Sequence, residues 1–251
     1  MTTRFSCAGC GKCCQDHHVP LTLDEARQWA EDGGVLIVLV EGFLDGDRRL
    51  PAAQREHAQR RSLAVRCGSV DAHVSVTFAA YNVGACRNLG ADMRCAIYDR
   101  RPLVCRIYPM EINPHIPLRT ALKECPSEAW EEGPVLIHGG HLVDLQLAEL
   151  IERSRQADRD EIADKVAICS LLGIRTMALK GDGFAAYLPD MRAFQQACER
   201  VRRDGLAAQA GETSWLFHAP DQALVAQLEE TGARLAAAME NFAYISLRKA
   251  S

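Results

Sequence analysis

The residues with the clearest chemical purpose in this chain are cysteines, of which the sequence holds eleven. Eight of them stand in two runs and one Cys-Pro pair: Cys7, Cys10, Cys13, Cys14, Cys86, Cys95, Cys105 and Cys125. A buried structural cysteine behaves as a small hydrophobe and gains nothing from a two-residue repeat. A Cys-x2-Cys turn, in contrast, directs two thiolates at one metal ion or cluster. We therefore predict that these eight thiols are metal ligands.

A disulfide framework is the main alternative to metal binding. The first residues, Met1 to Phe5, show no charged segment followed by an apolar one, so nothing in them marks the chain for secretion. In a reducing cytoplasm, closely spaced cysteines bind metals or take part in catalysis more often than they form disulfides. An odd count of eleven also disagrees with complete pairing. We expect a cytoplasmic protein with reduced thiols.

The composition is that of an ordinary globular protein. The chain has 251 residues, 48% hydrophobic and 25% charged, with a formal net charge of -4. That charge argues against a general nucleic-acid binder. The longest apolar stretch, residues 35–40, is far too short to span a bilayer and is typical of a buried strand. We therefore expect neither a membrane nor a nucleic acid as partner.

The first half of the chain predicts short elements around the cysteines. Thr22 and Glu25 have the spacing of a capping box, which opens a helix through about Ala30. The strand at 35–40 follows, and the polar stretch 48–61 is either a solvated helix or a mobile loop.

A second strand is indicated before the later cysteines, because Val74, Val76 and Phe78 alternate with polar residues. Several prolines within residues 86–126 then argue against long helices or strands in this segment. We expect turns and short helical pieces there, ordered by their metal.

The second half has a different pattern. Apolar residues follow helical spacing within 143–151, 191–201 and 224–242, while 181–189 and 205–220 carry the signals of a turn and a longer connection. We predict three or four helices. The fold class is then α+β: a cysteine-rich metal-binding domain of short strands and turns at 1–135, followed by a mainly α-helical region at 136–251.

The cysteine spacing also bears on the identity of the metal. A structural zinc site commonly has two Cys-x2-Cys pairs, whereas here the later cysteines are isolated by gaps of eight, nine and nineteen residues. This favours iron and sulfide, with four of the eight thiols at one [4Fe-4S] cluster. The run Cys7-x2-Cys10-x2-Cys13 with a remote Cys125-Pro126 partly matches ferredoxin spacing. Zinc stays open as the alternative.

The adjacent pair Cys13 and Cys14 departs from that ferredoxin pattern. Neighbouring residues of an extended chain face opposite ways, so the two thiols do not easily serve one metal centre. The pair therefore indicates either two centres, or one ligand and one functional thiol.

The cysteines and their neighbours resemble a known family. The motifs are Phe5-x-Cys7-x2-Cys10-Gly11-x-Cys13-Cys14, then Cys86, Cys95-x-Ile97-Tyr98-x2-Arg101-Pro102-x2-Cys105-Arg106-x-Tyr108-Pro109, and Cys125-Pro126. Over residues 5–126 they are similar to the CxxCxxCC cysteine-cluster family, described as a zinc- or iron-chelating domain. That family includes flagellin lysine-N-methylases, which also continue into a helical C-terminal half. The resemblance implies S-adenosylmethionine-dependent methylation of a protein or peptide lysine.

No catalytic residue can be assigned from the sequence, because no glycine-rich strand-turn-helix of the usual methyltransferase kind is present. Two further function classes therefore stay open. One is an electron-transfer module, and the other is an interaction protein with structural zinc. The oligomeric state is not addressed by any motif.

Four residues that accompany the cysteines are candidates for contact with the bound group. Arg101 and Arg106 would neutralise the negative charge of a thiolate-ligated cluster, although pairing with a carboxylate is equally common for arginine. Tyr98 and Tyr108 would pack over the site and exclude water. Cys169 and Cys198 lie on apolar helix faces and are expected in the core.

Overall fold

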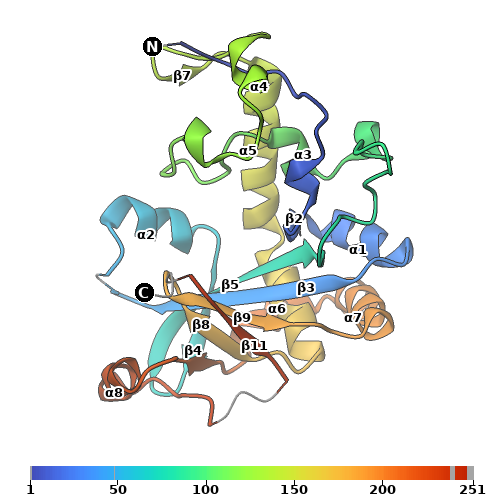
Figure 1. The fold of residues 1–251 in the computed structure, drawn as a ribbon. Coiled ribbons are helices and arrows are strands. Elements are labelled where there is room, and N and C mark those ends of the chain that lie inside the picture. The colour runs from blue at the N-terminus through green and yellow to red at the C-terminus, as the bar shows by residue number, and fades with distance from the viewer. Residues whose placement is uncertain (1, 48, 238–240, 248–251) are drawn as a thin grey trace. The chain divides into compact units, whose positions relative to one another are not determined.

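The computed structural model describes residues 2–47, 49–237 and 241–247. Mixed helices and strands confirm the α+β class. The chain forms two compact units, each built from two separate stretches (Figure 1). We call Met1–Leu21 with Ala80–Ala157 the cysteine unit, and Thr22–Ala79 with Asp158–Ser251 the sheet unit.

The cysteine unit has one small sheet, one long helix and several short pieces. Its strands are β1 (Thr2–Arg4), β2 (Val19–Leu21), β6 (Val135–His138) and β7 (His141–Leu142), of which β1, β6 and β7 form an antiparallel sheet in that order. Its helices are the 3-10 turns η1 (Lys12–Cys14), η2 (Tyr98–Arg100) and η3 (Thr120–Leu122), then α3 (Leu103–Ile107), α4 (Glu128–Glu131) and most of α5 (Leu145–Asp160).

A compact apolar core holds the cysteine unit together. Leu103 and Ile107 of α3 pack with Leu136 of β6 and with Leu147 and Ile151 of α5, and all five are buried. Because α3 also carries Cys105, this core fixes the position of one candidate ligand.

The sheet unit is built on a mixed sheet. Its strands are β3 (Leu36–Leu44), β4 (Leu63–Cys67), β5 (Val70–Ala80), β8 (Thr176–Leu179), β9 (Gly183–Tyr187), β10 (Leu216–His218) and β11 (Ala243–Ser246). β10, β8, β3 and β5 follow one another across the sheet, with β8 parallel to both β10 and β3. β9 runs antiparallel to β3, β11 to β9, and β4 to β5.

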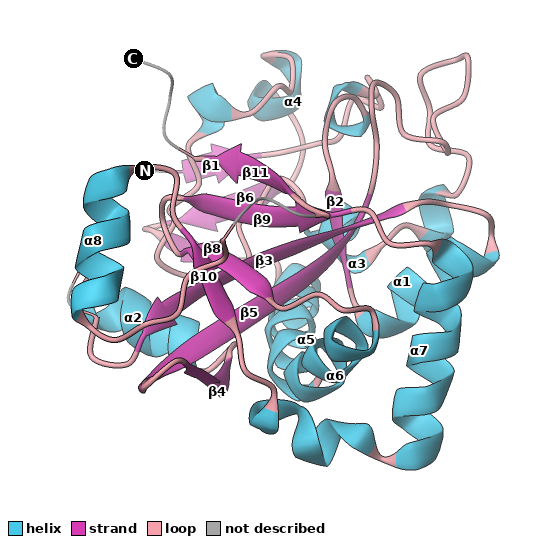
Figure 2. Ribbon diagram, turned by 90° about the horizontal axis from the view of Figure 1, so that it is seen from below, coloured by secondary structure: helices cyan, strands magenta, loops and turns pink. Residues whose placement is uncertain are grey.

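Helices cover this sheet. They are α1 (Leu23–Glu31), α2 (Ala52–Gln59), α6 (Ile162–Leu171), α7 (Met191–Asp204), the 3-10 helix η4 (Leu206–Glu212) and α8 (Gln222–Glu230). Figure 2 shows α1, α6 and α7 together on one side of the sheet. Buried side chains of β5 face this layer, and the Phe78 ring meets the Phe194 ring of α7 edge-on at 5.2 Å between centroids.

Several elements follow the sequence prediction. The Thr22 and Glu25 side chains and backbones form the expected capping box at the start of α1. The predicted strands correspond to β3 and β5, and the spacing at 143–151 and 191–201 corresponds to α5 and α7. The alternatives for 48–61 resolve into helix α2, while Arg48 lies outside the described residues.

Other predictions for the second half are wrong. The turn expected at 181–189 contains β9, and the connection expected at 205–220 contains η4 and β10. The helical spacing at 224–242 is realised only to Glu230, since Gly232 adopts a φ of +85° and β11 follows at Ala243; residues 238–240 lie outside the description. The region 136–251 therefore contributes strands as well as helices.

The sequence also predicted consecutive domains at 1–135 and 136–251, whereas the two compact units interleave along the chain. The division into domains at 1–135 and 136–251 stays a prediction, because it concerns which segments fold independently and the compact units do not test that. None of the helices within the described residues is both long enough and apolar enough to cross a membrane.

Candidate metal centre

All eight predicted ligands lie in the cysteine unit, and none of them forms a disulfide bond. The remaining three cysteines, Cys67, Cys169 and Cys198, lie in the sheet unit and are buried. Cys169 and Cys198 therefore occupy core positions as predicted, and the Cys67 thiol donates a hydrogen bond to the Arg234 carbonyl over 3.4 Å. The structure thus separates eight clustered thiols from three that serve packing.

The first cysteine run is shaped by a tight turn. Gly11 has a φ of +68°, and its carbonyl accepts a hydrogen bond of 3.0 Å from the Cys14 backbone N–H. This closes η1, which contains Cys13 and Cys14. In this turn the Cys13 and Cys14 thiols are close enough for each to influence the pKa of the other. The expectation for this pair assumed an extended backbone, whereas both residues lie in the 3-10 turn η1. Whether the two thiols serve one centre or two stays a prediction.

Backbone pairing attaches this turn to the second cysteine run. The Cys86 N–H donates to the Cys14 carbonyl over 2.7 Å, and Gln15 forms an antiparallel bridge with Ala85. A further antiparallel bridge joins Leu89 to Cys95. Two cysteine runs that are about seventy residues apart in sequence are thereby held next to each other.

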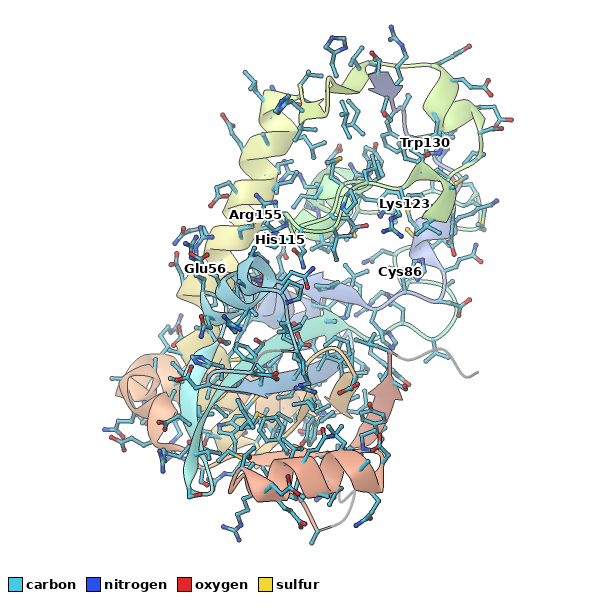
Figure 3. All side chains as sticks on the ribbon, turned by 90° about the vertical axis from the view of Figure 1, so that its left-hand side faces the viewer. Glu56, Cys86, His115, Lys123, Trp130 and Arg155 are labelled. Atoms are coloured by element: carbon cyan, nitrogen blue, oxygen red, sulfur yellow. The ribbon has the colours of Figure 1, made fainter. Side chains whose placement is uncertain are left out.

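The last two candidate ligands are held by α3 and by a side-chain contact. Cys105 lies on α3, and the Cys125 thiol donates a hydrogen bond of 3.5 Å to the Tyr108 hydroxyl. The Lys123 ammonium lies 5.2 Å from the centre of the Tyr108 ring and 2.6 Å from the Glu111 carboxylate. Figure 3 shows sulfur atoms gathering in the part of the cysteine unit where Cys86 and Lys123 are labelled.

The thiols influence one another electrostatically. Burial raises the pKa of Cys13 to about 12, and the charges of Cys14, Cys7 and Cys125 add to this rise. Burial and then the charges of Cys13, Cys86 and Cys95 raise the pKa of Cys105 to about 12 as well, while Arg101 opposes the rise. Unligated Cys13 and Cys105 therefore carry protons near neutral pH, and metal binding by these two thiols has to displace the protons.

The four accompanying residues occupy different surroundings. The Arg101 guanidinium stacks 3.6 Å from the centre of the Tyr98 ring, and its Nε donates a 2.8 Å hydrogen bond to the Tyr98 carbonyl. The Tyr98 side chain is about half exposed, at 49%. Arg106 is exposed, and burial together with the Cys125 contact raises the pKa of Tyr108. Their contact with a bound group stays a prediction.

Lys123 is a residue that the sequence did not single out. Its charge lowers the pKa of the Cys125 thiol, whose overall pKa is nevertheless raised by burial. Its position two residues before Cys125 was the available signal. Lys123 thus acts as a cation on the Cys125 thiol, and Arg101 acts in the same way on the Cys105 thiol.

The donor chemistry of the cysteine unit fits a zinc- or iron-binding group. Thiolates are soft ligands that suit zinc and iron-sulfur clusters, and the cations Arg101 and Lys123 lie near their charge. Within the described ranges, no three cysteine, histidine, aspartate or glutamate side chains are arranged to hold a metal ion together. Metal binding therefore requires the thiols to draw closer within loops already held by backbone pairing.

Substituting Gly11 by alanine is expected to destabilise the cysteine unit by about 2 to 4 kcal/mol. An added Cβ would lie 2.6 Å from the Met93 carbonyl oxygen, besides being strained by the positive φ. Thermal unfolding followed by circular dichroism measures the loss. Gly9→Ala is the matched control, because Gly9 has a similar φ of +63° and open space around it. Equal losses for the two variants would contradict the contact with Met93.

Comparison with known proteins identifies a family model that matches part of the chain. Residues 6–126 match the model of the family named CxxCxxCC, whose description is "putative zinc- or iron-chelating domain". No curated protein and no solved structure matches the chain. The match covers all eight candidate cysteines and no part of the chain after residue 126.

Proposed function

We propose that the cysteine unit holds a thiolate-ligated iron-sulfur cluster of the [4Fe-4S] type. The match of residues 6–126 to the CxxCxxCC family, described as a zinc- or iron-chelating domain, supports metal binding by this unit. The observation that carries this proposal is that the eight predicted ligands, none of them in a disulfide bond, lie in one compact unit, while the other three cysteines lie in the sheet unit. A zinc ion and a [4Fe-4S] cluster each take four thiolates, so the number of thiols suffices for either, and the isolated spacing of the later cysteines is what favours the cluster. When bound, such a cluster supplies one-electron chemistry, with a potential set by nearby charges and hydrogen bonds.

The residues of this chain would hold and tune the cluster. Lys123 and Arg101 place positive charge beside Cys125 and Cys105, which favours the thiolate form of each. The Tyr108 hydroxyl accepts a hydrogen bond from the Cys125 thiol in the unligated protein. Once Cys125 is a thiolate ligand, the Tyr108 hydroxyl is free to donate to its sulfur instead.

Anaerobic purification followed by iron, sulfide and zinc analysis tests the cluster. We expect at least four irons and four sulfides per chain, with broad absorption at roughly 400 nm from thiolate-to-iron charge transfer. Zinc without sulfide would contradict the iron-sulfur proposal and favour a structural zinc-binding interaction protein. The protein purified with a chelator under reducing conditions is the control spectrum.

For the activity, we infer S-adenosylmethionine-dependent methylation of a lysine in a protein or peptide. The support is the resemblance of residues 5–126 to the family that includes flagellin lysine-N-methylases. The methyl group would pass from the sulfonium sulfur to the lysine nitrogen, releasing S-adenosylhomocysteine and a proton. Calorimetric titration of the cluster-loaded protein with S-adenosylmethionine tests this inference. Absence of binding, together with reversible reduction of the cluster, would favour the electron-transfer alternative.

A further inference from the structure

A cleft of about 440 Å³ opens in the surface of the cysteine unit. Four side chains line it: Lys12, Gln15, Asp16 and Glu124. Small-molecule sites in proteins have volumes of roughly 300 to 1,000 Å³, so the cleft has room for a ligand of that kind. Lys12 directly precedes Cys13 and Glu124 directly precedes Cys125, so the cleft adjoins two candidate metal ligands without being lined by them.

Backbone contacts hold three of the lining residues in place. The Lys12 carbonyl accepts a hydrogen bond of 3.1 Å from the Gln15 N–H at the end of η1. The Asp16 N–H donates to the Gly84 carbonyl over 2.8 Å, and the Gly84 N–H donates back to the Asp16 carboxylate over 3.0 Å. Asp16 adopts a φ of +54°, which is uncommon for a residue other than glycine. The side chains of this turn therefore project from a backbone that is tied to a second segment of the unit.

Two of the lining side chains are donors that suit an anionic group. Across the residues that the structure describes, neither the Lys12 ammonium nor the Gln15 amide forms a hydrogen bond or an ion pair. Both groups carry N–H donors, and a hydrogen bond from an ammonium to a carboxylate is a strong one. This side of the cleft therefore fits a ligand carboxylate.

The other two lining side chains are carboxylates that suit a cationic group. One Asp16 oxygen accepts the Gly84 N–H, and Glu124 lies 3.5 Å from the His17 ring. An ionised carboxylate has about four acceptor positions, so both retain capacity for further hydrogen bonds. Asp16 and Glu124 are also exposed, so a ligand can reach them from solvent. This side of the cleft therefore fits a ligand ammonium.

We propose that the cleft binds the α-amino-acid group of a small ligand, with its carboxylate at Lys12 and Gln15 and its ammonium at Asp16 and Glu124. One ammonium against two carboxylates leaves a negative charge, which favours a ligand with a further positive charge. S-adenosylmethionine has this set of groups: a carboxylate, an ammonium and a sulfonium. Its choice as the ligand rests on the methylation inferred above, whereas recognition of the amino-acid group follows from the cleft itself.

Calorimetric titration of the full chain with S-adenosylmethionine, and separately with L-methionine, tests the cleft. Lys12→Met and Glu124→Gln are each expected to weaken the binding of both ligands about tenfold, because each removes a charged hydrogen-bond partner. Arg119→Met and Glu128→Gln are the matched controls. They remove exposed charges of the same unit outside the cleft lining, so they should bind both ligands as the wild type does.

Ultraviolet crosslinking of labelled S-adenosylmethionine to the wild-type protein, followed by peptide mapping, does not depend on how the variants fold. We expect the label in peptides that contain residues 12–16 or Glu124. Label confined to the sheet unit would overturn the cleft and leave the inferred methylation standing, as would wild-type affinity for S-adenosylmethionine in both variants.

The two ligands separate the cleft from the proposed function. Binding of L-methionine that both variants weaken, without any binding of S-adenosylmethionine, would keep the cleft and overturn the methylation. A wild-type protein that binds neither ligand would overturn both. The iron-sulfur cluster is judged independently by the iron and sulfide content of the same samples.

Discussion

Removal of the metal from the loaded protein is expected to unfold residues 86–126 while the sheet unit stays folded. This segment contains only η2, α3 and η3, of three, five and three residues. Elements this short have little stability of their own, so beyond the core contacts of Leu103 and Ile107 the metal has to supply most of the stability of this segment. Structural metals contribute about 10 kcal/mol or more to folding in small metal-binding domains.

Hydrogen exchange measured by mass spectrometry checks this expectation. Amides of residues 86–126 should exchange roughly a hundredfold faster or more after chelation under reducing conditions. Peptides from β3 and from residues 70–79 of β5 provide the internal reference, since they lie in the sheet unit and carry none of the candidate ligands. Unchanged exchange in 86–126, in a sample that metal analysis shows to be depleted, would contradict a folding role for the metal.

The second large effect is expected in the sheet unit, where Phe78→Ala should lower the free energy of unfolding by about 3 to 5 kcal/mol. Phe78 is fully buried, and its ring packs edge-on against the Phe194 ring. Truncation removes this ring contact and leaves a cavity that the surrounding side chains fill only in part. Chemical denaturation followed by circular dichroism measures the difference.

Leu188→Ala is the control for Phe78→Ala. Leu188 also lies in the sheet unit but is 56% exposed, so its truncation should change the unfolding free energy by less than about 0.5 kcal/mol. If Leu188→Ala costs as much as Phe78→Ala, burial of the aromatic ring is not the source of the effect.

The elements that the sequence predicted well are those encoded locally. The capping box of α1 depends on Thr22 and Glu25, only three residues apart. The strand β5 is visible because one face is buried and the other is not, which produces alternation from Ala72 to Phe78. Both signals need no knowledge of the rest of the chain.

The strands of the second half lacked such signals. All four residues of β8, Thr176 to Leu179, are buried, so the side chains on both faces of this strand are covered. A strand buried on both faces shows no alternation. β9 lies between Gly181 and Pro189. Because both residues are typical of turns, the sequence predicted a turn there instead of a strand.

For the candidate site, the sequence identified the ligand types but not their neighbours. Which thiols approach Cys14 is decided by the pairing of Gln15 with Ala85, a contact between residues seventy positions apart. The conformation of the Cys13–Cys14 pair is decided by the positive φ of Gly11 and the 3-10 turn it begins. Neither can be read from cysteine spacing.

The interleaving of the two units has a consequence for how the protein is made. On the ribosome, Cys7 emerges 118 residues before Cys125, with residues 22–79 of the sheet unit between the two cysteine runs. At about 5 to 20 residues synthesised per second, roughly 6 to 24 seconds pass between the synthesis of Cys7 and that of Cys125. Insertion of metal then comes after translation has passed Cys125, and delivery before that point would reach an incomplete set of ligands.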